Sequence, residues 1–251
     1  MIGRRRFLGL LAGASVASLA GPRAFAIGPR GRFRIARALY QGGNSEPHPD
    51  ALRRLAWEII LRTSVDADYD FPAVRLDDPA LFATPLVYLS GDRGFNPWSE
   101  AEVANFRRYL TLGGLALVDD AAGRPASDFN LSIRREAARL FPNAPLARLP
   151  DEHSIFRSYY LLRRVGGRVL VSPYLEGVQL PAHSPILYCR NDLGGAWARD
   201  ALGRWSADCV PGGESQRQAA FQLGVNVALY ALTLDYKQDQ VHLPFIRERL
   251  R

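Results

Sequence analysis

Three short apolar segments without polar alternation most constrain how this chain can fold. They are residues 86–89, 115–118 and 185–189, and polar residues follow each of them. A strand with one face in water alternates apolar and polar residues, whereas a continuous apolar strand has both faces covered. We therefore predict a mostly parallel sheet with helices packed on both of its faces.

Amphipathic segments alternate with the apolar ones, as this architecture requires. Apolar residues recur at helical spacing in four segments, and shorter extended stretches fill part of the remainder. The strand–helix–strand order is typical of an α/β protein. We expect helices at residues 49–63, 100–112, 129–140 and 215–234, additional strands at 32–40 and 168–171, short extended pieces at 146–149 and 155–162, and a C-terminal tail, 236–251, packed back along the body.

The start of the second helix carries a recognisable capping signal. Ser99 precedes Glu102 by three residues, which predicts a capping box in which each side chain bonds the other residue's backbone N–H. Gly113 and Gly114 then end the helix, since glycine adopts the left-handed C-terminal conformation at little cost.

The first 26 residues have the three parts of an export signal. Arg4 and Arg5 precede an apolar run over residues 8–20, and the small residues of 24–26 form a cleavage site. The paired arginines indicate the twin-arginine route. We predict a signal peptide at 1–26, one domain at 27–251 and a periplasmic location. The alternative is a retained membrane anchor, although the run is shorter than the roughly 20 apolar residues that span a bilayer.

Composition is that of an ordinary globular protein, with 47% hydrophobic and 23% charged residues, which excludes a disordered chain. The formal charge of +7 falls to +3 without the four leader arginines, which argues against a nucleic-acid-binding protein. In an oxidising compartment Cys189 and Cys209 could form a disulfide, or they could remain as two separate thiols.

Polar side chains follow the predicted strands at the places where strands end. In parallel α/β sheets, sites gather at the loops that leave the carboxyl ends of strands. The residues that meet this criterion, beside an acidic pair at 119–120, are the ligand-binding candidates Asn44, Ser90, Asp92, Asn191 and Asp192.

Asp119, Asp120 and His153 are the candidates for catalysis. Two carboxylates held close together raise the pKa of one of them, which would suit a general acid, and His153 could fold over the same edge as a base. The competing interpretation is that one aspartate caps a loop, the other pairs with an arginine, and His153 bonds a turn.

Other chemistries lack their usual markers. No Gly-x-Ser-x-Gly elbow is present, no phosphate-binding glycine motif follows the first strand, and His48, His183 and His242 form no ligand pair. We therefore predict no metal and no cofactor. Trp197 and Trp205 lie in a glycine-rich region and could serve as an exposed platform for an envelope carbohydrate.

Several strings together resemble the bacterial family called domain of unknown function 4159. They are residues 113–120 (GGLALVDD), 141–156, 191–197 (NDLGGAW) and 224–242. The resemblance covers nearly all of the chain after the leader. It implies an amidotransferase-like domain, shaped like class I glutamine amidotransferases, whose nucleophile is a cysteine at a strand end; no cysteine stands at the corresponding strand end here.

The resemblance also implies a role beside cell-envelope systems built around an AAA-type ATPase and von Willebrand-type proteins. No catalytic residue comes with it. We expect an exported, non-catalytic binding or accessory component with envelope protein partners, no nucleic acid and no membrane span after leader cleavage. The alternative is a hydrolase or metal-assisted enzyme that uses Asp119, Asp120 and His153.

Overall fold

The computed structural model describes residues 31–249, and the side chains of residues 31–234. The predicted leader, 1–26, lies outside the described residues. No helix in the described part of the chain is both long and apolar enough to cross a bilayer.

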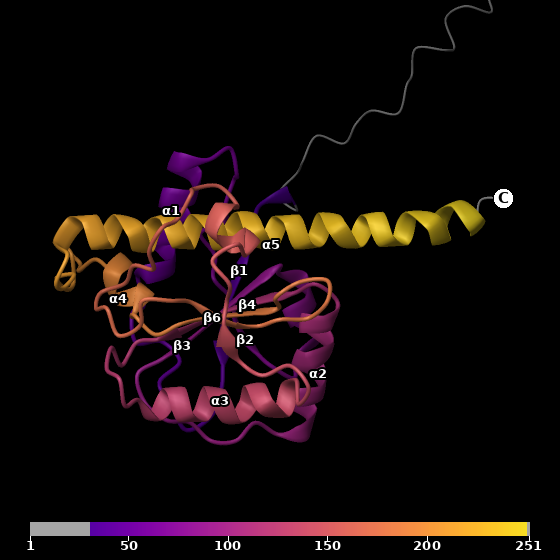
Figure 1. The fold of residues 1–251 in the computed structure, drawn as a ribbon, viewed down its shortest axis with the longest axis horizontal. Coiled ribbons are helices and arrows are strands. Elements are labelled where there is room, and N and C mark those ends of the chain that lie inside the picture. The colour runs from indigo at the N-terminus through magenta and orange to yellow at the C-terminus, as the bar shows by residue number, and fades with distance from the viewer. Residues whose placement is uncertain (1–30, 250–251) are drawn as a thin grey trace, which may run out of the picture. The chain divides into compact units, whose positions relative to one another are not determined.

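The core is a seven-stranded sheet, as the continuous apolar segments predict (Figure 1). Its order is β2-β1-β3-β4-β7-β6-β5. Neighbouring strands are parallel throughout the part β2-β1-β3-β4-β7, whereas β6 is antiparallel to both of its neighbours, β7 and β5. The strands are β1 (Ile35–Leu39), β2 (Ala73–Arg75), β3 (Leu86–Gly91), β4 (Leu115–Asp120), β5 (Ala147–Arg148), β6 (Glu176–Val178) and β7 (Ile186–Cys189).

Helices cover both faces of the sheet (Figure 1). One face carries α1 (Ala51–Arg62), α4 (Leu193–Trp197) and α5 (Gly213–Arg249), which pack against one another, and the 3-10 helix η3 (Ser154–Arg157). The other face carries α2 (Glu100–Thr111), α3 (Asp128–Leu140) and the 3-10 helix η2 (Pro79–Ala83).

Strand β4 shows why an apolar segment without alternation belongs in the middle of such a sheet. Leu115 and Leu117 join the core beneath α1 and α5, whereas Ala116 and Val118 join the core beneath α2 and α3. Successive side chains of a strand point to opposite faces, so both faces need apolar residues when both are covered. The prediction of a covered strand is confirmed.

The chain reverses its direction of travel across the sheet between β1 and β3. From β1 the chain passes through α1 to β2 at one edge, whereas from β3 it passes through α2 to β4 toward the other edge. The loops that follow β1 and β3 therefore separate at the carboxyl ends of two adjacent strands, which is where open α/β sheets bind ligands.

The predicted capping box at the start of α2 is confirmed. Ser99 Oγ accepts the N–H of Glu102 at 3.2 Å, and Glu102 Oε2 accepts the N–H of Ser99 at 2.8 Å.

Three predictions about the second half of the chain are wrong. Residues 168–171 form no strand, because the N–H groups of Arg168 and Val169 bond carbonyls of the irregular segment after β7 rather than a ladder. Residues 155–162 begin within η3 instead of extending. The helix predicted to end at residue 234 continues as α5 to Arg249, where a separate tail was expected.

Candidate functional site at the carboxyl edge of the sheet

The last two residues of β4, Asp119 and Asp120, are fully buried and face opposite sides of the sheet. Each receives a phenol from a neighbouring strand. Tyr88 of β3 donates to Asp119 Oδ2 at 2.6 Å, and the Tyr188 hydroxyl of β7 lies 3.3 Å from Asp120 Oδ2 and 3.1 Å from Asn130 Oδ1. The two carboxylates therefore do not share a cation or a proton, because the sheet lies between their side chains.

Asp119 holds the first turn of α4. Its Oδ1 accepts the N–H of Leu193 and its Oδ2 accepts the N–H of Gly194, both at 2.8 Å. Burial raises the pKa of Asp119 to about 7, the charge of Asp192 adds to the rise, and the hydrogen bonds from Tyr88, Gly194 and Leu193 oppose it. The carboxyl group thus titrates near neutrality within a set of structural bonds.

Asp192 is the N-cap of α4, with a left-handed backbone (φ 55°) that non-glycine residues rarely adopt. Its Oδ1 accepts the N–H of Gly195 at 2.8 Å and lies 2.9 Å from His48 Nε2, and its Oδ2 pairs with Arg168. Its side chain is completely buried, so Arg168 and the neighbouring imidazole of His48 offset a charge that would otherwise be costly there.

His48 is the partly exposed member of this group, with 24% of its side chain accessible. Burial by itself would lower the pKa of His48, but the close contact and charge of Asp192, together with the charge of Asp119, outweigh it and raise the pKa. The imidazole therefore favours its protonated form more than an isolated histidine does.

Space between these groups is tight. A Cβ added to Gly194 would lie 2.7 Å from Tyr88 Oη, 3.0 Å from His48 Cδ2 and 3.3 Å from Asp119 Oδ2. Gly194 therefore lets α4 approach the sheet closely enough for Asp119 to reach its amides.

Asp120 serves α3 in a similar way. Its Oδ1 accepts the N–H of Ala122 at 3.1 Å and the hydroxyl of Ser127 at 3.0 Å. Ser127 is the N-cap of α3 and in turn accepts the N–H of Asn130. Burial raises the pKa of Asp120, and the bonds from Ser127, Ala122 and Tyr188 oppose the rise.

The loops after β1 and β3 are tied to each other where they separate. Asn44 Nδ2 donates to Asp92 Oδ2 at 3.0 Å, and Tyr40 Oη lies within hydrogen-bond distance of the carbonyls of Asn44 (2.9 Å) and Ser90 (2.7 Å). Ser90 Oγ itself is buried and has no hydrogen-bond partner within the described part of the chain. A Cβ on Gly91 would lie 2.3 Å from Tyr40 Oη, so this crossing requires glycine.

Asn191 is bonded to backbone on both ends of its amide. Its Oδ1 accepts the N–H of Ser172 and its Nδ2 donates to the carbonyl of Ser172, both at 2.8 Å. With no exposed surface, Asn191 fixes the segment that precedes β6 beside the end of β7.

His153 lies apart from the aspartates. Its Nδ1 accepts the N–H of Ile155, capping η3, and its Nε2 lies 2.9 Å from Ser184 Oγ. Burial and the charge of Arg157 lower the pKa of His153. The structure makes no hydrogen bond or ion pair between His153 and Asp119 or Asp120 within residues 31–234.

The expectation that Trp197 is exposed is wrong. Its side chain is completely buried in α4, where it packs between Phe221 and Tyr88 with ring centroids 6.4 and 6.2 Å away. The short helix, which was not predicted, turns the indole inward. Trp205 is half-buried between Arg199 and Arg217.

Sequence reasoning missed His48, Arg168 and the two tyrosines. His48 follows the first strand in the loop that contains Asn44, so the same edge criterion could have found it. Arg168 had no such signal, because it comes from an irregular segment far away in the sequence.

Neither a metal cluster nor a disulfide occurs among the described side chains. No group of three His, Cys, Asp or Glu side chains there could hold a metal ion. Cys189 and Cys209 are separate buried thiols, which agrees with the second of the two alternatives.

The fold and this edge define a doubly wound α/β protein whose strand-end aspartates hold the N-termini of two helices. The chain belongs to the family described as a domain of unknown function (DUF4159), whose model matches residues 34–232. A search of the curated proteins finds no match.

Proposed function

We propose that the chain is an exported, non-catalytic binding or accessory component of a cell-envelope assembly, built on an amidotransferase-like scaffold. The observation that carries this proposal is the saturation of the edge carboxylates. Asp119 accepts three hydrogen bonds, Asp120 accepts two and lies 3.3 Å from the Tyr188 hydroxyl, and Asp192 is engaged by one amide, by Arg168 and by His48. A general acid or base needs an oxygen that can reach substrate, and these oxygens are already committed to protein groups.

The nucleophiles in the described part of the chain support the same interpretation. Cys189 at the end of β7 is completely buried, and burial together with the charge of Asp119 raises the pKa of its thiol. Burial also raises the pKa of Cys209. A nucleophilic cysteine requires the opposite change, toward a thiolate at neutral pH.

Ser90 does not replace them. It stands at a strand end, but its hydroxyl is buried and bonds no imidazole within residues 31–234. Activation of a serine requires a base within hydrogen-bond reach.

Export and partners rest on the leader and on the family. The paired arginines and the apolar run at 8–20 support passage by the twin-arginine route to the periplasm. The family resemblance, which implies a role beside envelope systems built around an AAA-type ATPase and von Willebrand-type proteins, supports partners of those classes.

A second candidate, an acid–base enzyme, is favoured by one observation. His48 is partly exposed, is paired with a buried carboxylate and has a raised pKa, which are properties of a catalytic histidine. In this hypothesis His48 and Asp192 carry out the acid–base chemistry for which the sequence suggested His153, Asp119 and Asp120.

One experiment separates the two candidates. The full-length protein and its His48→Gln variant are purified from the envelope fraction and mixed with the AAA-type and von Willebrand-type proteins of the same host. Complex mass is measured by light scattering, and hydrolysis is measured on a panel of p-nitrophenyl esters and phosphates.

The proposal predicts that the wild type and His48→Gln form a complex of the same fixed stoichiometry with the partner proteins. It also predicts that the wild type hydrolyses the panel no faster than His48→Gln does. Hydrolysis that is lost in His48→Gln would favour the enzyme. Absence of any complex would overturn the accessory role.

A further inference from the structure

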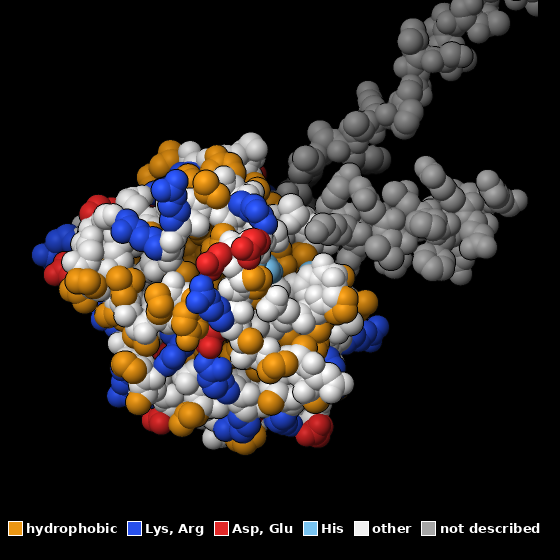
Figure 2. All heavy atoms as spheres, viewed as in Figure 1, with side chains coloured by type: hydrophobic (Ala, Val, Ile, Leu, Met, Phe, Trp, Pro, Cys, Tyr) orange, Lys and Arg blue, Asp and Glu red, His pale blue; other side chains and the backbone are white. Residues whose placement is uncertain are grey.

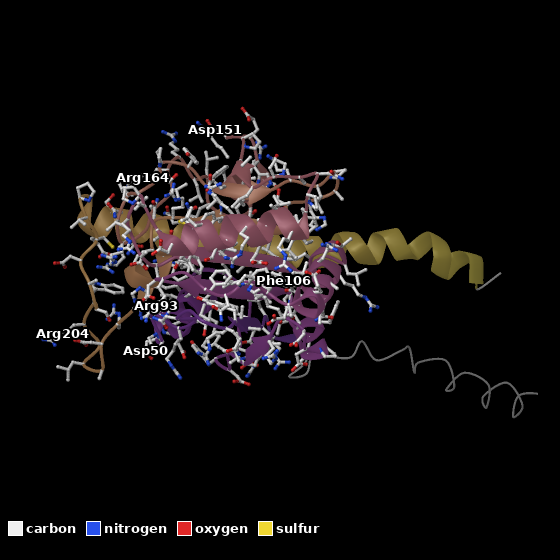
Figure 3. All side chains as sticks on the ribbon, turned by 90° about the horizontal axis from the view of Figure 1, so that it is seen from below. Asp50, Arg93, Phe106, Asp151, Arg164 and Arg204 are labelled. Carbon is white, nitrogen blue, oxygen red and sulfur yellow. The ribbon has the colours of Figure 1, made fainter. Side chains whose placement is uncertain are left out.

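A cavity of about 500 Å³ opens beside α1, away from the aspartates of the sheet edge. We call it the arginine cavity; its walls include Asp50, Arg53, Arg54, Trp57, Tyr69 and Arg199. Its volume lies within the range of small-molecule sites in proteins. Figure 3 labels the wall residue Asp50, and Arg204, which pairs with the wall residue Asp200, at the end of the molecule opposite the C-terminal part of α5.

Positive charge exceeds negative charge in this cavity. Arg53 makes no ion pair or side-chain hydrogen bond within residues 31–234, and Arg199 bonds only the carbonyl of Gly203. Three arginines face two acidic wall residues; Asp200 is already paired with Arg204, and Asp50 makes no ion pair with a wall arginine within residues 31–234. Two guanidinium groups therefore lack a carboxylate partner among the described residues.

The third guanidinium, that of Arg54, adds to the crowding. It pairs with Glu58, yet its Nε and that of Arg199 are buried without a hydrogen-bond acceptor. Burial lowers the pKa of Arg54, Glu58 opposes this change, and the charge of Arg199 adds to it. Crowded cations of this kind are stabilised by a bound anion.

Two aromatic rings also line the cavity. Trp57 and Tyr69 are each 41% exposed, and Arg54 stacks 3.9 Å from the centre of the indole of Trp57. Trp205 lies 4.0 Å from Arg199 and holds that guanidinium in place. Exposed rings next to fixed cations suit a flat ligand that carries a negative charge.

We propose that the arginine cavity binds a small oxyanion attached to a planar ring. The oxyanion, a carboxylate or a phosphate, is held by Arg53 and Arg199, since the guanidinium fork matches both groups. The ring lies against Trp57 and Tyr69. This ligand site goes beyond the accessory role and does not depend on it.

The test uses the full chain and four probes in isothermal titration calorimetry. Phenyl phosphate and benzoate carry both the ring and the charge, whereas inorganic phosphate carries only the charge and benzyl alcohol carries only the ring. We expect phenyl phosphate, benzoate or both to bind at least about tenfold more tightly than either partial probe, and more weakly at high salt. The tighter of the two identifies the oxyanion.

Variants locate the contact. Arg53→Gln removes an exposed side chain that makes no ion pair or hydrogen bond within residues 31–234, and so leaves the fold intact. Arg199→Gln removes the guanidinium that Trp205 holds. Each is expected to weaken binding about tenfold. The control is Arg148→Gln, which lies in a different cavity beside Tyr174.

If neither phenyl phosphate nor benzoate shows binding at a probe concentration of about 10 mM, the proposal is overturned. Binding that is unchanged in Arg53→Gln and Arg199→Gln, or reduced equally in Arg148→Gln, would overturn it as well.

Discussion

Asp119 and Asp192 bind three consecutive backbone amides of one short helix from two sides. Asp119 accepts the N–H groups of Leu193 and Gly194, and Asp192 accepts that of Gly195. The N–H groups of a first helical turn have no partners within the helix, so these carboxylates satisfy donors that would otherwise be buried and unpaired. Their like charges also raise the pKa of Asp119.

Replacing Asp119 with alanine should destabilise the protein strongly. The change leaves Tyr88 and two amides without acceptors in a dry interior, and we expect a loss of about 2–4 kcal/mol in the free energy of unfolding, measured with urea. Asp151→Ala is the control, because Asp151 is 78% exposed and should change stability by less than about 0.5 kcal/mol. Equal effects of the two variants would contradict the role of Asp119.

Stability should depend on pH through Asp119. Its folded pKa of about 7 exceeds the unfolded value, so the folded state binds more protons between the two. The contribution of this group is therefore fully present below about pH 4 and is lost as the pH rises through about 7. The raised pKa of His48 acts in the same direction above the ordinary histidine value of 6.5.

Asp119→Asn isolates this contribution, because asparagine does not titrate. Compared with the wild type, the variant should gain relative stability between pH 5 and pH 7.5 in urea unfolding, on the order of 1 kcal/mol or more. A difference between the two proteins that stays constant with pH would contradict the raised pKa.

Ser127 should contribute more than an ordinary helix cap. Ser127→Ala removes the N-cap of α3 and one donor to buried Asp120, so we expect a loss of about 2 kcal/mol. The matched control is Ser99→Ala at the capping box of α2, where the serine is exposed, with an expected loss of about 1 kcal/mol. Thermal or urea unfolding measures both, and a Ser127 variant no worse than the Ser99 variant would count against the Asp120 link.

Both cysteines should be protected in the folded protein. Cys189 and Cys209 are buried, and burial raises the pKa of each thiol. Under native conditions at pH 8 a thiol reagent such as DTNB should react slowly, and denaturant should release two equivalents without reductant. No free thiol after unfolding would show a disulfide instead.

The sheet could be predicted because its signals are local. Continuous apolar segments such as residues 115–118 and the capping box at Ser99 depend on neighbours within a few positions. Strand β6 and the segment at 168–171 could not be predicted, since their hydrogen-bond partners come from other parts of the chain.

In the candidate site, too, the features with local signals could be predicted and those that depend on distant parts of the chain could not. The rule that strands end at a common edge identified Asp119, Asp120, Asn191 and Asp192, but it could not show what each oxygen accepts. Trp197 was misplaced because a glycine-rich string was interpreted as a loop, whereas Asp192 and Asp119 cap it as a helix.

Over the face shown in Figure 2, basic side chains are interspersed with hydrophobic and acidic ones.

The most direct test of the account is amide hydrogen exchange at Leu193 and Gly194 in the wild type and in Asp119→Ala. If the strand-end aspartates serve the backbone, exchange at these amides should accelerate by at least about tenfold beyond the change at Leu187 in the core. Unchanged exchange at Leu193 and Gly194, accompanied by loss of a hydrolytic activity, would show instead that Asp119 acts on a substrate.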